Sequence, residues 1–162
     1  MRAFVVDVNV AIVANGGSPQ ADIDCLSACV DALRDIVKNG VIVLDDGMII
    51  LKEYMGHLSL KGQPGLGDAF MQWVWENQSV ESRCERVGLT QTGDVEDEFL
   101  QFPDDPELRN FDCSDRMYVA VALGSQKNPE ILNAVDTDWW NHRIALERNG
   151  VRIQFLCPQN MQ

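Results

Sequence analysis

Apolar residues fall along this chain in short runs that are separated by polar turns. Several runs are continuous, rich in β-branched or aromatic residues and free of internal breakers, which is typical of short strands buried on both faces of a sheet. Such runs predict strands over residues 3–7, 41–44 and 131–135, and the less regular segments 84–89 and 151–156 are also expected to form strands.

Between these runs the apolar residues recur at helical spacing. In the segment 19–39, Ser18 fits the N-cap, Pro19 the first helical residue and Gly40 the C-terminal stop. Residues 61–67 read as a loop. The helical pattern covers residues 19–39, 48–60, 68–77, 114–125 and 139–148.

Strands that alternate with helices predict a parallel sheet covered on both sides. We expect an α/β fold, a three-layer α/β/α sandwich with a mostly parallel central sheet of four to five strands. Residues 1–162 read as one domain, and residues 79–111 as an irregular acidic insertion whose acids gather between 94 and 105.

Carboxylates stand beside several apolar runs. Asp7 ends the first strand, Glu53 lies inside an apolar helix, Asp115 opens another helix, and Asp136 and Asp138 follow a later strand. A carboxylate next to a buried element costs desolvation energy unless something compensates it. Ligands of parallel sheets gather beyond the carboxyl ends of the strands, so convergence of these side chains would form a cation site there. Oxygen ligands of this kind suit Mg²⁺ or Mn²⁺.

Each acid also has an ordinary structural explanation. Asp7 could cap a turn, and Glu53 could be an exposed helix residue. Asp115 and Asp138 could be helix N-caps or first-turn acids favoured by the helix dipole. The metal hypothesis therefore depends on all four residues together.

Net charge and the lengths of the apolar runs exclude some classes of protein. The 13 basic and 25 acidic residues give a net charge of −12, which argues against a protein that coats nucleic-acid phosphates. The charge is compatible with solubility, with a basic partner and with a nuclease that holds phosphate through metal ions. No run of apolar residues is long enough for a membrane span, and the one at the N-terminus is too short for a signal peptide.

The cysteines are odd in number and scattered, with no CxxC pair. They predict neither a zinc knuckle nor a disulfide framework, and favour a reduced, cytoplasmic protein. They are Cys25, Cys29, Cys84, Cys113 and Cys157.

The order of the acidic motifs resembles that of the PIN-domain family. In that family a first strand ends in Asp, a Glu lies on a helix after the second strand, an Asp opens a later helix, and a further strand leads into a Thr-x-Asp segment. The corresponding segments here are Val5-Val6-Asp7-Val8-Asn9, Leu51-Lys52-Glu53-Tyr54, residues 114–122 and residues 134–140, with residues 151–158 resembling the last strand. The match covers nearly the whole chain, although residues 62–111 align poorly.

The resemblance implies a metal-dependent endoribonuclease that uses Mg²⁺ or Mn²⁺ to hydrolyse RNA. The family's acidic positions correspond to Asp7, Glu53, Asp115 and Asp138. It also suggests a toxin whose partner is a basic antitoxin or another protein. Many members form dimers, so a homodimer is compatible with it.

Further residues acquire expected roles from the same comparison. Asn9 corresponds to the polar residue that supports the first Asp, and Asp136 stands where the family often has Thr or Ser. Asp136 could add a ligand or face solvent, and Asp112 competes with Asp115 for its place. The nearest cations for phosphate contact are Arg116 and Arg143.

Two other functions remain open at this point. One is a catalytically inactive PIN-like binding or scaffold module, which the negative charge suggests. The other is a haloacid-dehalogenase-like phosphatase, suggested by Asp7 after the first strand, although that family needs a second Asp where Asn9 stands. His57 and His142 are too isolated for a zinc site or a catalytic triad. Adjacent Trp139 and Trp140 cannot both face the core easily, so we expect one near the site.

Overall fold

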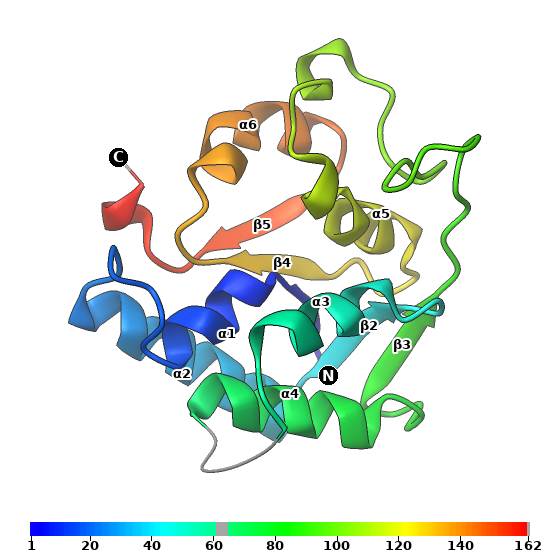
Figure 1. Cartoon of the computed structure of the whole chain (residues 1–162). Coiled ribbons are helices and arrows are strands. Elements are labelled where there is room, and N and C mark those ends of the chain that lie inside the picture. The colour runs from blue at the N-terminus through cyan, green and yellow to red at the C-terminus, as the bar shows by residue number, and fades with distance from the viewer. Residues whose placement is uncertain (61–64, 162) are drawn as a thin grey trace.

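The computed structural model describes residues 1–60 and 65–161. Within these residues, five parallel strands form one sheet in the order β3-β2-β1-β4-β5, with helices on both faces (Figure 1). The predicted three-layer α/β/α fold is confirmed. The strands are β1 (Ala3–Val6), β2 (Val41–Asp45), β3 (Cys84–Val87), β4 (Glu130–Asn133) and β5 (Arg152–Phe155).

The helices form the two outer layers. α1, α2 and α4 pack on one another along one face of the sheet, α5 and α6 cover the other, and α3 lies beside α1, α4 and β2 (Figure 1). Among residues 1–60 and 65–161, none of the helices is long and apolar enough to cross a bilayer. The helices are α1 (Val8–Ala14), α2 (Ile23–Asn39), α3 (Ile49–His57), α4 (Leu66–Asn77), α5 (Arg116–Gly124) and α6 (Thr137–Arg148).

The largest differences from the sequence prediction are at α1 and α2, since the other helices begin within two residues of the predicted starts. The sequence pattern did not predict α1, because its alternating valines look like a continuing strand; here Asp7 caps it by accepting a hydrogen bond from Asn9 N. α2 begins at Ile23 with Asp22 as its N-cap, so Ser18 and Pro19 precede the helix. Of the predicted loop 61–67, residues 61–64 lie outside the described residues.

The strand order places a crevice between β1 and β4. The chain runs from β1 through β2 to β3 on one side, then returns to form β4 and β5 on the other. The connections therefore leave β1 and β4 in opposite directions at their carboxyl ends, which is where parallel sheets bind ligands. Asp7 directly follows β1, and its N–H donates to Leu132 O of β4 at 3.1 Å. The first acid of the sequence pattern thus lies at this crevice.

The acidic segment between β3 and α5 is irregular but anchored. It contains the single bridge Gln91–Phe99 and the 3-10 helices η1 (Pro106–Leu108) and η2 (Cys113–Asp115), and it runs over α5 (Figure 1). The side chains of Phe99, Leu108 and Phe111 are buried. Arg116 donates to the carbonyls of Arg109 and Phe111 at 3.0 and 3.2 Å. The segment is thereby fixed over the sheet end.

A disulfide joins Cys25 on α2 to Cys157, which follows β5. The prediction that the chain has no disulfide is wrong. The partners are 132 residues apart, and only the folded chain brings the N-terminal end of α2 to the turn after β5. Disulfides are rare in a reducing cytoplasm, which argues against the expected cytoplasmic location. That location stays a prediction.

Candidate metal centre

Three carboxylates converge at the crevice between β1 and β4. Oxygen atoms of Asp7, Asp115 and Asp136 all lie within 4.8 Å of one another. Each residue occupies the N-cap position of a helix, namely α1, α5 and α6. The N-terminal end of a helix carries a partial positive charge, which favours an acidic side chain there. Three helix starts therefore bring these acids to one point.

Asp7 is the most buried of the three, with 2% of its surface exposed. One oxygen accepts from Asn9 N at 3.0 Å and the other from Asn133 Nδ2 at 3.2 Å. Burial raises the pKa of Asp7 to about 7, and the charges of Asp136 and Glu53 act in the same direction. The Asn9 hydrogen bond opposes this rise but does not cancel it.

Asp115 and Asp136 are joined by a side-chain hydrogen bond that affects the pKa of each. Burial raises the pKa of Asp115 to about 9, with further contributions from the charges of Asp7 and Asp136. Burial also raises the pKa of Asp136, although its side-chain hydrogen bond to Asp115 and the Asp138 N–H counteract the rise. A raised pKa favours the protonated form of Asp115, whose carboxyl group then donates a hydrogen bond to Asp136. A divalent ion could replace that proton and neutralise the cluster.

Trp139 completes the surroundings of Asp115. Its buried indole donates from Nε1 to Asp115 Oδ2 at 3.3 Å. Trp140 instead packs edge-on against Phe155 of β5. The expectation that one of the two tryptophans lies near the site therefore holds for Trp139.

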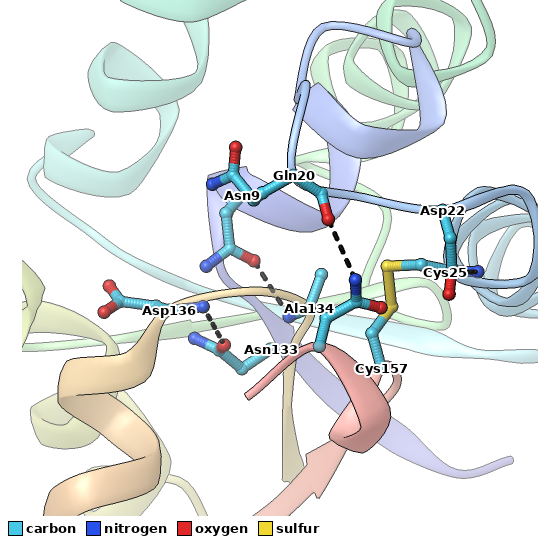
Figure 2. The surroundings of a disulfide bond; sticks show 9 residues. Asn9, Gln20, Asp22, Cys25, Asn133, Ala134, Asp136 and Cys157 are labelled. Carbon is cyan, nitrogen blue, oxygen red and sulfur yellow. Dashed lines mark hydrogen bonds between the residues drawn. A yellow bond between two sulfur atoms is a disulfide. The ribbon is translucent and has the colours of Figure 1, made fainter. Parts of the chain in front are cut away.

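Asn133 is a site residue that the sequence analysis missed. Its side chain is fully buried at the end of β4, where Nδ2 donates to Asp7. Figure 2 shows that its Oδ1 accepts from Asp136 N, at 3.2 Å. It therefore holds two of the three acids in position. The available signal was a lone amide within the apolar run 131–135.

Asn9, expected to support the first Asp, contacts β4 instead through its side chain. Its Oδ1 accepts from Ala134 N at 3.0 Å (Figure 2), and its backbone N–H donates to Asp7. The side chain ties α1 to the end of β4. This bond gives Asn9 a structural role. Asparagine also lacks the carboxyl group that a dehalogenase-like phosphatase needs at this position.

The sequence predicted Asp138 as a metal ligand, but this residue is not one of the three clustered acids. Its Oδ2 accepts from Asp112 N at 3.0 Å, and its Oδ1 pairs with His142 Nδ1 at 3.2 Å. Asp138 is already inside α6, whereas Asp136 caps the helix with an extended backbone. Asp112 in turn caps η2 by accepting from Ser114 N, and its charge raises the pKa of each cluster acid.

Glu53 approaches the cluster from α3 without joining it. Its side chain is 37% exposed and pairs with His57 at 3.3 Å, and its charge raises the pKa of Asp7. Together with Lys52 and Phe99 it lines a cleft of about 540 Å³ between α3 and the acidic segment. The cleft thus adjoins the acidic cluster through Glu53.

Both arginines predicted to contact phosphate are engaged in the fold. Arg116 lies over the ring of Phe102 at 4.8 Å and donates to backbone carbonyls. Arg143 lies over the Trp140 ring at 4.1 Å and donates to its carbonyl at 2.7 Å. Lys52 lines the cleft beside Glu53 and supplies a positive charge there.

The cluster acids differ from a buried acid that serves the fold alone. Asp45 is also 2% exposed, but both its oxygens accept backbone N–H groups, from Ile49 at 2.8 Å and Ile50 at 2.9 Å. The three clustered acids face one another instead. Several carboxylates gathered at one point are a donor set that suits Mg²⁺ and Mn²⁺.

Comparison of this chain with family models, with curated proteins and with solved structures gave no match.

Proposed function

We propose that this chain is a Mg²⁺- or Mn²⁺-dependent endoribonuclease of the PIN type. The observation that carries the proposal is the meeting of Asp7, Asp115 and Asp136 at the crevice between β1 and β4. Like charges at this spacing are unfavourable, and a divalent cation is the group that relieves them most directly. The order of acidic motifs, which resembles the PIN family, supports the same function.

The three clustered acids would hold the ion, and Asn133 would fix the positions of Asp7 and Asp136. A bound ion would polarise a phosphoryl oxygen and lower the pKa of a water molecule. Glu53 stands on the cleft side, where it can accept a proton from an attacking water. His57, paired with Glu53 at 3.3 Å, restrains that carboxylate.

The cleft beside Glu53 would admit the RNA backbone. Glu96 and Asp97 line it together with Lys52, so phosphate groups meet little positive charge there. The affinity for RNA would therefore depend on the metal ion. The net charge of −12 suits a basic antitoxin as protein partner, in keeping with a toxin of a toxin–antitoxin pair.

One observation favours an inactive binding module as a second candidate. Arg116 and Arg143 both use part of their guanidinium groups to hold backbone carbonyls and aromatic rings, so each has a role in the fold. A chain that had lost cleavage could keep the acidic cluster for a basic protein. Metal binding with no cleavage of any RNA would favour this second function.

The test is cleavage of end-labelled structured RNA in Mn²⁺ by the wild type and by Asp115→Asn. Loss of a metal ligand should lower the rate by about 100-fold or more, because the ion contributes several kcal/mol to the transition state. Asp94→Asn changes an exposed acid of the acidic segment by the same chemistry and should leave the rate unchanged. Circular dichroism establishes that each variant is folded. Full activity in Asp115→Asn would remove the acidic cluster from the mechanism.

A further inference from the structure

A second cluster of three side chains, separate from the acidic one, joins α2 to the turn after β5. The sulfur atoms of Cys25, Cys29 and Cys157 are all within 4.8 Å of one another, and all three residues are fully buried. Cys25 and Cys29 stand one turn apart on the same face of α2. Cys157 comes from the turn after β5, and Figure 2 shows its bond to Cys25. We refer to these three residues as the thiol cluster.

The cluster lies at the start of a helix. Cys25 is the third residue of α2, and its backbone N–H donates to the N-cap side chain of Asp22 at 2.8 Å. The partial positive charge of a helix N-terminus favours a thiolate over a thiol. In the oxidised chain, burial raises the pKa of Cys29 to about 12, so this third sulfur remains a neutral thiol.

An unpartnered oxygen belongs to the same turn as Cys157. Asn160 Oδ1 is buried and accepts no hydrogen bond, the one such side-chain atom in residues 1–60 and 65–161. Asn160 is fixed there, because its backbone N–H donates to Cys157 O at 2.9 Å and its Nδ2 donates to Gln20 O at 2.8 Å. The latter bond is drawn beside the disulfide in Figure 2. Burying an acceptor without a partner costs about 1–3 kcal/mol, so this oxygen is a candidate ligand atom.

We propose that reduction of the disulfide converts the thiol cluster into a site for a thiophilic divalent cation such as Zn²⁺, with Cys25, Cys29 and Cys157 as thiolate ligands and Asn160 Oδ1 as the fourth donor. Tetrahedral zinc with Zn–S bonds of about 2.3 Å places its sulfurs roughly 3.8 Å apart. Cys29 Sγ lies within 4.8 Å of both other sulfurs, and reduction frees Cys25 and Cys157 to separate to the spacing that zinc requires. The site is separate from the acidic cluster and does not depend on nuclease activity.

The conversion needs a reductant of the dithiol class. The dithiol supplies two electrons, the Cys25–Cys157 bond breaks, each sulfur takes a proton, and the reductant closes to its own disulfide. Zn²⁺ then binds three thiolates and displaces three protons from the cysteines. In the oxidised form a covalent bond holds the C-terminal turn to α2, and in the reduced form a metal ion holds it.

The experiment titrates the full chain with Cd²⁺, a spectroscopic substitute for Zn²⁺, under anaerobic conditions with excess Mg²⁺. The reduced protein should bind one equivalent with a thiolate-to-metal charge-transfer band in the ultraviolet, and the oxidised protein should show no band. Mg²⁺ should not displace the ion, because it does not bind thiolates. Absence of the band in the reduced wild type would overturn the proposal.

Variants identify the ligands. Cys29→Ser keeps the disulfide but should lower the Cd²⁺ affinity of the reduced chain by about 100-fold or more, given that loss of an outer-shell partner alone costs 10–100-fold. Cys84→Ser, at a buried free cysteine on β3, is the matched control and should bind as the wild type does. Equal affinity in the two variants would remove Cys29 from the site. Cys29→Ala serves if the serine variant does not fold. Asn160→Ala should lower the affinity by about tenfold, and an unchanged affinity would remove the fourth donor.

Discussion

The acidic cluster and the thiol cluster both gather three ionisable side chains, but they differ in how these side chains affect stability. Each brings three potential anions within 4.8 Å from separate parts of the chain. The thiols are largely neutral near pH 7, and two of them can form a covalent bond, as Cys25 and Cys157 do. The carboxylates have no such bond and must keep protons or take up a cation. The thiol cluster therefore stabilises the fold, whereas the acidic cluster lowers its stability unless an ion is bound.

The largest expected effect is on the thiol side. Cys157→Ser opens a covalent link between residues 132 positions apart, and should lower the free energy of unfolding by about 2–4 kcal/mol under oxidising conditions. Urea denaturation of both proteins measures this difference. Cys113→Ser, at an exposed cysteine, is the control and should match the wild type. Equal stability of Cys157→Ser and wild type would show that the bond adds nothing to the fold.

On the acidic side, the sharpest comparison is between neighbouring residues of α6. Asp136→Asn should weaken Mn²⁺ binding by about 100-fold, while Asp138→Asn should change it by less than about threefold. Asparagine caps helices as well as aspartate does, so both variants keep the helix start. Isothermal titration calorimetry gives the two affinities. The reverse ranking would return the ligand role to Asp138, as the sequence had suggested.

This pair also shows what the sequence could and could not predict. The carboxyl ends of parallel strands share one edge, so the strand pattern alone was enough to place Asp7 and the Asp136–Asp138 segment together. It could not choose between the last two acids, because the choice depends on which residue caps the helix. Asp136 is the cap, with an extended backbone, and its carboxylate lies within 4.8 Å of those of Asp7 and Asp115.

Other features depend on contacts between distant residues. Only Asp7 separates β1 from α1, and the valines of α1 suit either structure, so the cap at Asp7 and packing against α2 and α4 select the helix. The pairing of Cys25 with Cys157 has no local signal at all. Asn133 was visible as a polar residue in an apolar run, but its partners come from β1 and α6.

The acidic cluster should also make the metal-free protein sensitive to pH. The pKa values of Asp7 and Asp115 are raised to about 7 and about 9, so the folded chain holds protons that the unfolded chain has lost above about pH 4. Their contribution to stability is therefore full below about pH 4 and is lost as the pH rises through the folded-state values.

Urea denaturation between about pH 6 and pH 7 should show the free energy of unfolding falling by on the order of 1 kcal/mol per pH unit. Asp115→Asn should flatten this slope, since it removes one raised pKa. Saturating Mn²⁺ should flatten it as well, because the ion replaces the protons. A slope that is the same with and without Mn²⁺ would mean that the ion does not bind at these acids.

The smallest expected effect tests whether the two clusters are independent. They approach each other through Asn133, whose carbonyl accepts from Leu156 N at 2.9 Å, one residue before Cys157. The parallel pairing of β4 with β5 should persist when the disulfide is reduced, because it involves four residue pairs from Glu130–Arg152 to Asn133–Phe155. Reduction should therefore weaken Mn²⁺ binding by less than about tenfold, below the usual effect of removing a group that contacts a ligand directly.

Calorimetry on the oxidised and dithiol-reduced wild type measures this coupling, with Cys25→Ser as the control that lacks the bond in both states. If reduction abolished Mn²⁺ binding in the wild type, Asn133 would depend on the disulfide for its position, and the acids and thiols would form one redox-sensitive unit.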